Sequence, residues 1–558
     1  MGNNNDINKS FDKWYNNYQE SLIRHPECKE EYKNISGIAL KPLYTPLDVK
    51  KQNYSEKSGY PGEYPYTRGI YPGMYRTQEW TRRMLLGYEM PETFNRRQKA
   101  LLAAGANAIN LIPDNPYARG FDSDQIDKEL IGTSGVPLNF VNDMAIAFDG
   151  IPLDKVSTAF NDPGPFMVVA MFFALAQEQG IPLAKLRGTS NQSDFISHYV
   201  SLSMASRLSL EGHLRVTIDH IKFCEKNLPG WNPLSIVGQH MQQAGATPMQ
   251  ALAFSLSTGI FFIDQCVKAG MDVDSFAPRV TFFYDVSINF FEEVAKFRAG
   301  RRMWAKILKE RFNSKSPRAM KFKFHAQTSG VDLTRQQPLN NISRATLQGL
   351  AAVFGGVQSL HVDAYDEAYQ CPTEESSHIA LMSQNIIAEE SGITDVIDPL
   401  GGSYYVEKLT DQMEAGAWEY IKKIDKMGGM LEAARQGYIQ REIGGSALKS
   451  QIELDNGKRT VVGLNKYVLP GEKEIKPVEV KTNLVEIEKH IQRVKDLKKS
   501  RDQAGFKSAL KDLHEAALDE NENVFEAILN AVKARASSAE ILAELRSSLG
   551  SDNLPTTL

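Results

Sequence analysis

The sequence predicts an α/β fold in which parallel strands close into a (β/α)8 barrel, with an N-terminal helical arm and a C-terminal helical extension. From Pro61 to about Pro399, short β-branched or apolar runs alternate with longer helical patterns, and this alternation favours a parallel sheet. Polar residues directly follow several candidate strands, as they do at the carboxyl-terminal face of barrel enzymes. A doubly wound sheet is disfavoured, because no GxGxxG or GxxxxGKS/T phosphate loop follows a strand.

Four candidate strands are followed by the polar residues that point to a site. They are 108–112 followed by Asp114, 235–238 followed by Gln239 and His240, 320–324 followed by His325 and Gln327, and 356–360 followed by His361. An imidazole at such a position either makes a structural hydrogen bond or donates to a substrate carbonyl oxygen and stabilises developing charge. The residues alone leave both interpretations open for each histidine.

The chain divides into five predicted segments. Residues 1–45 form a polar arm, 46–405 the barrel, and 406–463 helices packed on the barrel. Residues 464–480, which hold Pro and Gly among charges, read as a linker, and 481–558 as a charged helical extension.

Composition excludes several classes of protein. A net charge of −4 disfavours general binding to nucleic acid or to an anionic membrane, and we find no apolar run long enough to cross a bilayer. The 4 cysteines are far apart, without metal-ligand spacing, so we expect no disulfide framework and no metal bound by this chain. The first residues lack the order of a signal peptide, and a reducing cytoplasm is the expected location.

The densest polar and aromatic segment is 64–75, followed by Trp80 to Arg83. Tyr, Gly, Pro and Arg interleaved this closely predict either a binding loop or a rigid surface loop with solvated arginines. Arg279 likewise either contacts a phosphate or caps a helix. The charged set 113–124 lacks the downstream glutamate of a calcium loop, and no Ser/His/Asp elbow or HExxH helix occurs.

Taken together, these motifs resemble the methylmalonyl-CoA mutase family, in the forms that place the substrate and cobalamin domains on two chains. The resemblance runs from Pro61 to Gly463. It is carried by YPYTRG (64–69), the segment 71–83, GFDSD (120–124), GQHMQQAGA (238–246), FAPR (276–279), HAQTSG (325–330), QSLH (358–361) and VIDPLGGSYY (396–405).

The resemblance implies a CoA thioester threaded along the barrel axis. Residues implied to bind substrate or CoA are Tyr71, Pro72, Gly73, Met74, Gln78, Thr81, Arg83, Leu85, Ile112, Thr189, Asn191, Leu202, Asn232, Arg279 and Thr281. His240 is implied to hydrogen-bond the thioester carbonyl, with Gln192 or Asn191 as a second donor. Residues implied to face the cofactor are Pro113, Gln239, Gln243, Gln327, Gln358, Asp363 and Glu367.

The implied cofactor is adenosylcobalamin, which supplies a radical that lets the acyl skeleton rearrange. The family binds it through a DxHxxG sequence, which none of the 10 histidines here satisfies. We therefore expect a separate small cobalamin-binding subunit. The resemblance also implies a heterotetramer and a GTPase chaperone as a further partner.

Departures from the family pattern bear on the acyl group. A tyrosine and an arginine hold the second carboxylate of methylmalonyl-CoA in the family, but Leu85 stands at the tyrosine position, and the segment 199–203, where the arginine should fall, contains none. An unpaired buried carboxylate is costly, so we expect a monocarboxylic substrate of the isobutyryl or 2-hydroxyisobutyryl kind. Ile112 replaces the aspartate that contacts the hydroxyl in 2-hydroxyisobutyryl-CoA mutases. Pro113 replaces an aromatic residue of the family. Gln78 and Gly73 replace an arginine and a threonine among the residues implied to bind CoA.

The sequence leaves three alternatives open. The first is a methylmalonyl-CoA mutase large subunit, and the second is a catalytically inactive assembly paralogue. The third is an unrelated barrel enzyme that acts on a sugar or aldol substrate and binds no CoA.

Overall fold

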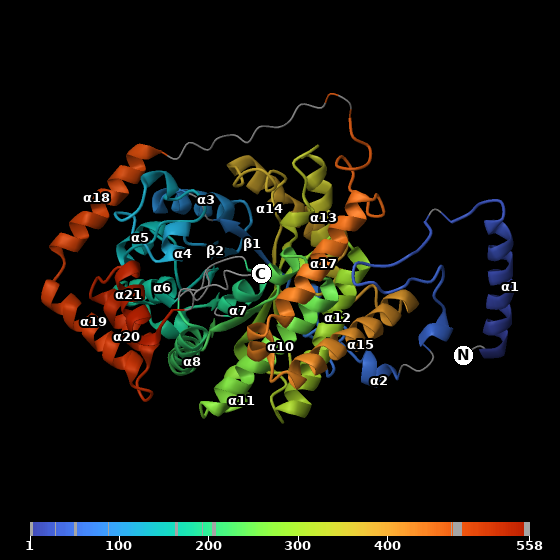
Figure 1. Cartoon of the computed structure of the whole chain (residues 1–558), viewed down its shortest axis with the longest axis horizontal. Coiled ribbons are helices and arrows are strands. Elements are labelled where there is room, and N and C mark those ends of the chain that lie inside the picture. Colours follow the sequence, from blue (N-terminus) through green and yellow to red (C-terminus); the bar gives the residue numbers. More distant parts are fainter. Residues whose placement is uncertain are drawn as a thin grey trace.

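A nearly closed ring of parallel strands forms the centre of the molecule (Figure 1). The structure, a computed structural model, describes residues 4–27, 29–49, 53–86, 89–161, 166–191, 193–202, 208–469, 471 and 483–551. The strands are β1 (Thr81–Leu86), β2 (Ala108–Leu111), β3 (Ser157–Phe160), β4 (Gly188–Ser190), β5 (Trp231–Asn232), β6 (Leu234–Val237), β7 (Val280–Val286), β8 (Phe324–Thr328) and β9 (Ser359–His361). All their pairings are parallel, in the order β5-β4-β3-β2-β1-β9-β8-β7-β6.

The ring closes between β5 and β6, which are separated only by Pro233. Before this proline the chain pairs with β4, and after it with β7. Proline has no N–H to donate to a neighbouring strand. The pairing therefore changes at Pro233, and β5 and β6 together occupy one of the eight strand positions of the barrel. Above it, Ser193 bridges the ring: its Oγ donates to the Ser235 carbonyl at 2.8 Å and accepts the Val237 N–H at 2.9 Å. The predicted (β/α)8 barrel is confirmed, with β5 and β6 counted as one interrupted strand.

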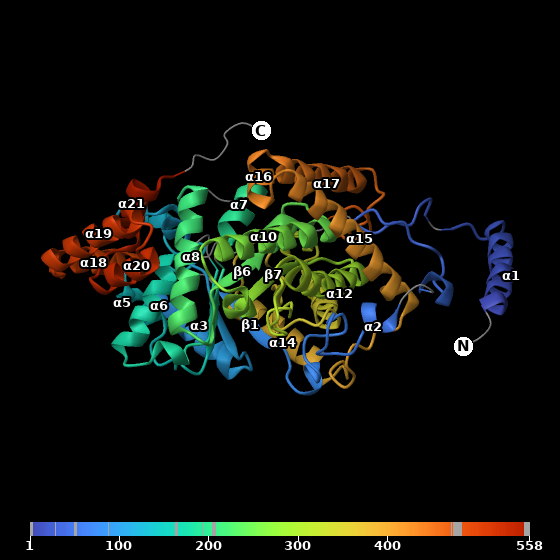
Figure 2. The same ribbon diagram turned by 90° about the horizontal axis from the view of Figure 1, so that it is seen from below.

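Helices cover the outside of the ring (Figures 1 and 2). The main ones are α3 (Pro91–Ala103), α5 (Val141–Ala147), α6 (Phe166–Glu178), α8 (Leu210–Asn227), α10 (Pro248–Lys268), α12 (Phe290–Lys306), α13 (Asn340–Phe354) and α14 (Glu374–Glu389). Short helices at the strand ends are α4 (Asn115–Arg119), α7 (Asp194–Ser201), α9 (Gln239–Gln243) and α11 (Val273–Phe276). The expectation that no segment is apolar and long enough to cross a bilayer is corrected for α10, which meets both criteria, although 78% of its most apolar window is buried inside the protein.

The buried face of α12 carries arginines that tie distant segments to the barrel. Arg298 pairs with Asp398 at 2.5 Å and with Glu407 at 2.6 Å. Arg68 pairs with the other oxygen of Asp398 at 2.8 Å, and Arg301 donates to the carbonyls of Tyr66 and Thr67. Removing one partner of such a buried pair typically costs about 3–5 kcal/mol. The segment 64–69 is therefore anchored by its backbone and Arg68, while the residues after it reach the barrel interior.

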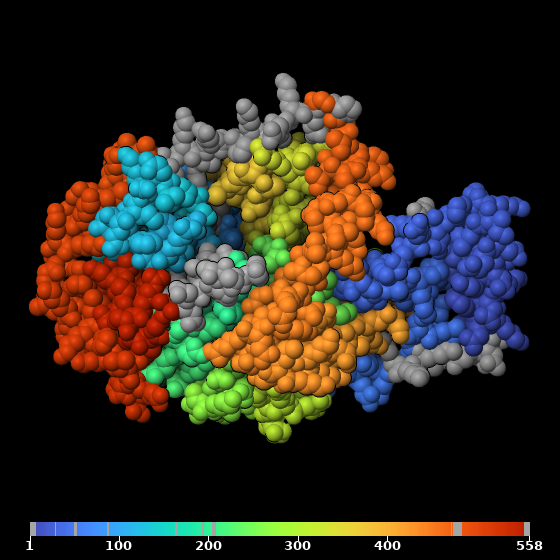
Figure 3. Space-filling model, viewed as in Figure 1, coloured from blue at the N-terminus to red at the C-terminus, as the bar shows by residue number. Residues whose placement is uncertain are grey.

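Further helices extend the barrel on two sides. α15 (Tyr404–Lys426) packs on α10 and α12, and α16 (Met430–Arg435) and α17 (Tyr438–Asp455) follow it. The C-terminal helices are α18 (Leu484–Ser500), α19 (Gln503–Leu518), α20 (Val524–Lys533) and α21 (Ser538–Leu549), with α20 packed on α6 and α8. Most of the predicted linker lies outside the described residues. The arm, α1 (Asn4–Leu22), and the short α2 (Tyr54–Lys57) lie at the end opposite to the C-terminal helices (Figure 3).

The predicted charged set around 120–124 holds the C-terminal helices in place. Asp122 is fully buried, accepts the Ala539 N–H at 3.1 Å at the start of α21, and pairs with Lys498 at 2.9 Å. Asp124 pairs with the same lysine at 2.7 Å. A carboxylate at a helix N-terminus satisfies amides that have no partner within the helix. The role of this motif in the structure is therefore docking of the extension.

Candidate active site

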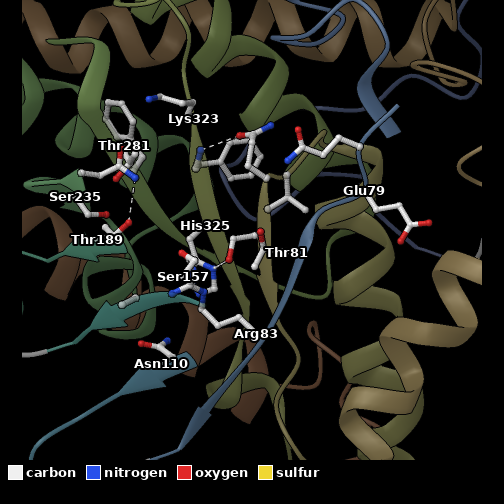
Figure 4. A pocket seen from close by; sticks show the side chains of 18 of the residues that line it. Glu79, Thr81, Arg83, Asn110, Ser157, Thr189, Ser235, Thr281, Lys323 and His325 are labelled. Atoms are coloured by element: carbon white, nitrogen blue, oxygen red, sulfur yellow. Dashed lines mark hydrogen bonds between the residues drawn. The ribbon is translucent and has the colours of Figure 1, made fainter. Parts of the chain in front are cut away.

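A cavity of about 240 Å³ runs inside the ring of strands. Figure 4 shows side chains from several strands pointing into it. Its wall is made by Tyr71, Met74, Tyr75, Gln78, Glu79, Thr81, Arg83, Asn110, Ser157, Ala159, Asn161, Thr189, Asn191, Asn232, Ser235, Thr281, Phe282, Lys323, Phe324, His325, Val357, Gln358 and Ser359. Most of the strand residues in this wall are small or polar, whereas a typical barrel fills its interior with bulky branched side chains.

The strand registers explain which residues face inward. Side chains alternate across a strand, and Thr81 pairs with Ser359 while His325 pairs with the same serine. The register also sets Leu85 opposite Asn110. A residue two positions after an inward-facing residue also faces inward. Leu85, two residues after Arg83 on β1, and Ile112, two residues after Asn110 at the end of β2, therefore face the barrel interior.

Ten of the residues predicted for substrate, CoA or cofactor line this cavity. They are Tyr71, Met74, Gln78, Thr81, Arg83, Thr189, Asn191, Asn232, Thr281 and Gln358. The cavity wall does not include Pro72, Gly73, Leu85, Ile112, Pro113, Leu202, Gln239, His240, Gln243, Arg279, Gln327, Asp363 or Glu367. Gln192 lies outside the described residues.

The amino-terminal opening of the ring is cationic. Lys323 lies in the cavity wall, with Arg279, Arg318 and Lys321 around it. Burial and then these three cations lower the pKa of Lys323 to about 8. Arg279 donates to the backbone carbonyls of Leu228 and Trp231. Within the described part of the chain, no carboxylate forms an ion pair with any of the four, so this opening suits an anionic group.

Arg83 and His325 occupy the middle of the cavity. Arg83 donates to the Ile109 carbonyl at 3.0 Å and to Ser157 Oγ at 3.2 Å, and burial lowers its pKa to about 10. His325 shares a hydrogen bond of 2.9 Å with Ser359, and burial, followed by the charge of Arg83, lowers its pKa well below the ordinary value. His325 is thus a neutral imidazole beside a buried cation.

A hydrogen-bonded group of amides and carboxylates lies at the carboxyl-terminal ends of β8 and β9. His361 accepts the Leu85 N–H at Nδ1, so its Nε2 carries the proton and faces Asp363 at 3.0 Å. Gln327 donates to the same Asp363 oxygen at 3.0 Å. Glu367 keeps part of its surface in contact with solvent. Desolvation of its carboxyl group, followed by the negative charges of Asp363 and Asp366, raises its pKa. The second carboxylate oxygen of Asp363 is buried without a protein partner in the described structure.

His240 stands on α9, directly after β6. Burial lowers its pKa to about 4, so the imidazole is neutral at physiological pH. Its Nδ1 lies 3.1 Å from Ser197 Oγ on α7. On the same helix, Gln239 is buried and Gln243 donates to Asp285 at 3.2 Å, at the end of β7.

Several residues of the site were not predicted from the sequence. The strand alternation that places Thr81 and Arg83 inward also identifies Ser157, Ser235 and Lys323, so that signal was present. Asn110 is buried in the cavity wall, and its Oδ1 has no partner within the described structure. Ser197 and His198, in contrast, lie on a helix whose sequence gives no indication that they meet His240.

A cavity along the barrel axis, with small and polar side chains among its lining and cations at one opening, is a candidate binding site inside the ring of strands. The family model for methylmalonyl-CoA mutase matches residues 33–551. The 2-hydroxyisobutanoyl-CoA mutase large subunit of Aquincola tertiaricarbonis is 39% identical over 94% of this chain and 93% of its own length. The methylmalonyl-CoA mutase of Cereibacter sphaeroides is 37% identical over 96% of this chain and 75% of its own, and the human mitochondrial enzyme is 37% identical over 92% and 68%.

The chain therefore belongs to the methylmalonyl-CoA mutase family. The predicted family is confirmed, and so is the predicted enzyme class, an isomerase of acyl-CoA thioesters. The acyl group is not decided by these relatives, because mutases with different named substrates match the chain at similar identity.

Proposed function

We propose that this chain is the large subunit of a cobalamin-dependent mutase that interconverts branched and linear monocarboxylic acyl-CoA thioesters, of the isobutyryl- or 2-hydroxyisobutyryl-CoA kind. The observation that carries the proposal is the cavity along the barrel axis with cations at its amino-terminal opening. We also propose that the enzyme works in the cytoplasm with a separate small cobalamin-binding subunit. The names of two relatives as large subunits support that partner.

The two halves of the cavity suit the two halves of a CoA thioester. Arg279, Arg318, Lys321 and Lys323 offer cations for phosphates at the amino-terminal opening, where Arg318 is exposed and the other three are partly buried. In the same cavity wall, Thr189, Asn232 and Thr281 offer hydroxyl and amide groups to the amides of an extended pantetheine arm. A narrow channel that binds this arm also excludes water from the reacting end of the substrate.

Apolar side chains near the carboxyl-terminal end of the cavity support a monocarboxylic acyl group. Leu85, on β1, and Ile112, directly after β2, are half-buried inward positions. Arg83, the cation one layer below Leu85, is already engaged by the Ile109 carbonyl and Ser157. A second carboxylate beside Leu85 and Ile112 would lose its hydration without gaining a charged partner from these residues.

The carboxyl-terminal end of the barrel fits the nucleoside part of adenosylcobalamin. Gln327, Asp363 and Glu367 would hold its hydroxyl groups, and the buried unpartnered oxygen of Asp363 is an acceptor of the type that a ribose hydroxyl needs. When bound, the cofactor supplies the radical chemistry of the rearrangement. The protein residues bind, orient and seclude the substrate.

His240 is proposed to donate a hydrogen bond to the thioester carbonyl. Its low pKa keeps it neutral, so it polarises the carbonyl without giving up a full proton. Asn191, at the end of β4 and in the cavity wall, is a candidate second donor, as is Gln192.

Turnover assays with the purified large and small subunits and adenosylcobalamin test this proposal. Isobutyryl-, 2-hydroxyisobutyryl- and methylmalonyl-CoA are compared under identical conditions. We expect one of the two monocarboxylic substrates to have the highest kcat/KM. Dominant turnover of methylmalonyl-CoA would remove the proposed acyl specificity, and absence of turnover with all three would remove the proposed activity.

A further inference from the structure

Two residues of α7 contact the imidazole of His240, and the mechanism above assigns neither of them a role. Ser197 is 1% exposed, and its Oγ lies 3.1 Å from His240 Nδ1. The ring of the next residue, His198, is stacked on the ring of His240, with centroids 4.0 Å apart and an interplanar angle of 29°. His198 is 8% exposed. One edge and one face of the imidazole are thus in contact with α7.

The contact at Nδ1 bears on which ring nitrogen carries the proton. A neutral imidazole has a single N–H, and the other nitrogen accepts. Donation to a thioester oxygen from Nε2 requires the proton at Nε2 and an accepted hydrogen bond at Nδ1. A serine hydroxyl can rotate to donate to Nδ1. A backbone N–H could only donate to this nitrogen, and a carboxylate could only accept from it.

The position of α7 relative to His240 is itself fixed by the barrel. Ser193 precedes α7 and bonds to the backbone of Ser235 and Val237 on β6, the strand that leads into α9. α7 also contacts both α9 and β6. Ser197, four residues after Ser193, therefore lies one helical turn along the same side of α7.

We propose that Ser197 and His198 are positioning residues for His240: the Ser197 hydroxyl donates to Nδ1 and thereby holds the proton on Nε2, while the His198 ring fixes the plane of the imidazole. This inference rests on the proposed function only in taking Nε2 as the atom that meets the substrate carbonyl. The tautomer and its dependence on Ser197 are properties of the large subunit alone.

Nitrogen NMR of the full-length large subunit with ¹⁵N-labelled histidine measures the tautomer directly. The signal of His240 is identified by its loss in His240→Gln. We expect the Nε2–H tautomer in the natural protein and a shift toward a mixture in Ser197→Ala. Ser383→Ala is the matched control, because it removes another buried helical hydroxyl, which donates to the Ile379 carbonyl on α14.

The Nδ1–H tautomer in the natural protein, or no change in Ser197→Ala, overturns the proposal. If Ser197→Ala does not fold, Ser197→Cys serves instead, since a thiol keeps the shape but is a weak donor. For the stacked ring, His198→Phe should preserve the His240 signal, and His198→Ala should broaden or move it. Equal spectra for the two variants would contradict the role of the ring.

Kinetics with the small subunit provide a second readout. Loss of one neutral hydrogen bond predicts that kcat falls roughly fivefold to tenfold in Ser197→Ala, with KM for the acyl-CoA within about twofold. A rise of KM at constant kcat contradicts positioning of the reacting group. If no acyl-CoA is turned over by the natural enzyme, the proposed function fails, while the NMR result still decides the role of Ser197.

Discussion

The two ends of the barrel carry opposite chemistry although the same strands connect them. At the amino-terminal end, Arg279, Arg318, Lys321 and Lys323 gather without a paired carboxylate in the described structure. At the carboxyl-terminal end, Asp363, Asp366 and Glu367 lie together among amides. A strand of about six residues separates the ends by roughly 20 Å. One ring can therefore bind an anionic group at one end and a hydroxyl-rich group at the other without the charges neutralising each other.

The largest expected effect is at the carboxyl-terminal end. His240→Ala should lower kcat by about 10²- to 10³-fold, because a donor aimed at the reacting carbonyl is lost, with a small change in the dissociation constant of CoA. Steady-state turnover together with calorimetric binding of free CoA measures both. His378→Ala, on the exposed surface of α14, is the control. A loss of CoA affinity that matches the loss of kcat would show that His240 contributes to binding rather than to the reaction.

Arg279→Ala should have the opposite profile at the amino-terminal end. Loss of a phosphate-binding cation predicts a KM increase of roughly tenfold to a hundredfold, with kcat nearly constant. Arg311→Ala, which breaks an exposed pair with Asp425, is the matched arginine control. A fall in kcat at constant KM for Arg279→Ala would reverse the assignment of the two ends.

The depressed pKa of Lys323 predicts a pH effect confined to the amino-terminal end. The ammonium group loses its proton as pH rises through about 8, so CoA affinity should fall by roughly tenfold across that range. An anion bound beside it raises the pKa again, so binding near pH 8 should take up a proton. Calorimetry in buffers with different ionisation enthalpies detects this uptake. Lys323→Arg should abolish both the uptake and the pH dependence, and their persistence would point to another group.

The smallest expected effect concerns coupling between the ends. Glu367→Gln should leave CoA affinity within about twofold. The double variant Arg279→Ala/Glu367→Gln should show the sum of the single effects to within about 0.5 kcal/mol, because the sites share no partner. A larger deviation, measured by a double-mutant cycle on CoA binding, would mean that the ends communicate.

Local pattern predicted the barrel and part of its cavity, because both depend on short-range periodicity. Thr81, Arg83 and Thr281 are on strands whose alternation fixes the inward face, so their position followed from the sequence together with the resemblance. The anchoring of segment 64–69 did not, because Arg301 and Asp398 contact it from more than 200 residues away. Nor did the docking role of Asp122, whose partner Ser537 lies 415 residues later. Contacts of this range leave no periodic signal in either segment.

The bridge that Ser193 makes beside Pro233 gives the ring a seam. Elsewhere neighbouring strands share a ladder of backbone hydrogen bonds, whereas among the described residues here the hydroxyl group of Ser193 joins the segment after β4 to β6. Local opening of the barrel should therefore begin between the segment after β4 and β6. Hydrogen exchange at Val237 would then outpace exchange at the centre of β7, and Ser193→Ala would widen the difference. A cylinder that can part along one line can admit a bulky acyl chain and close again without unfolding its other strands.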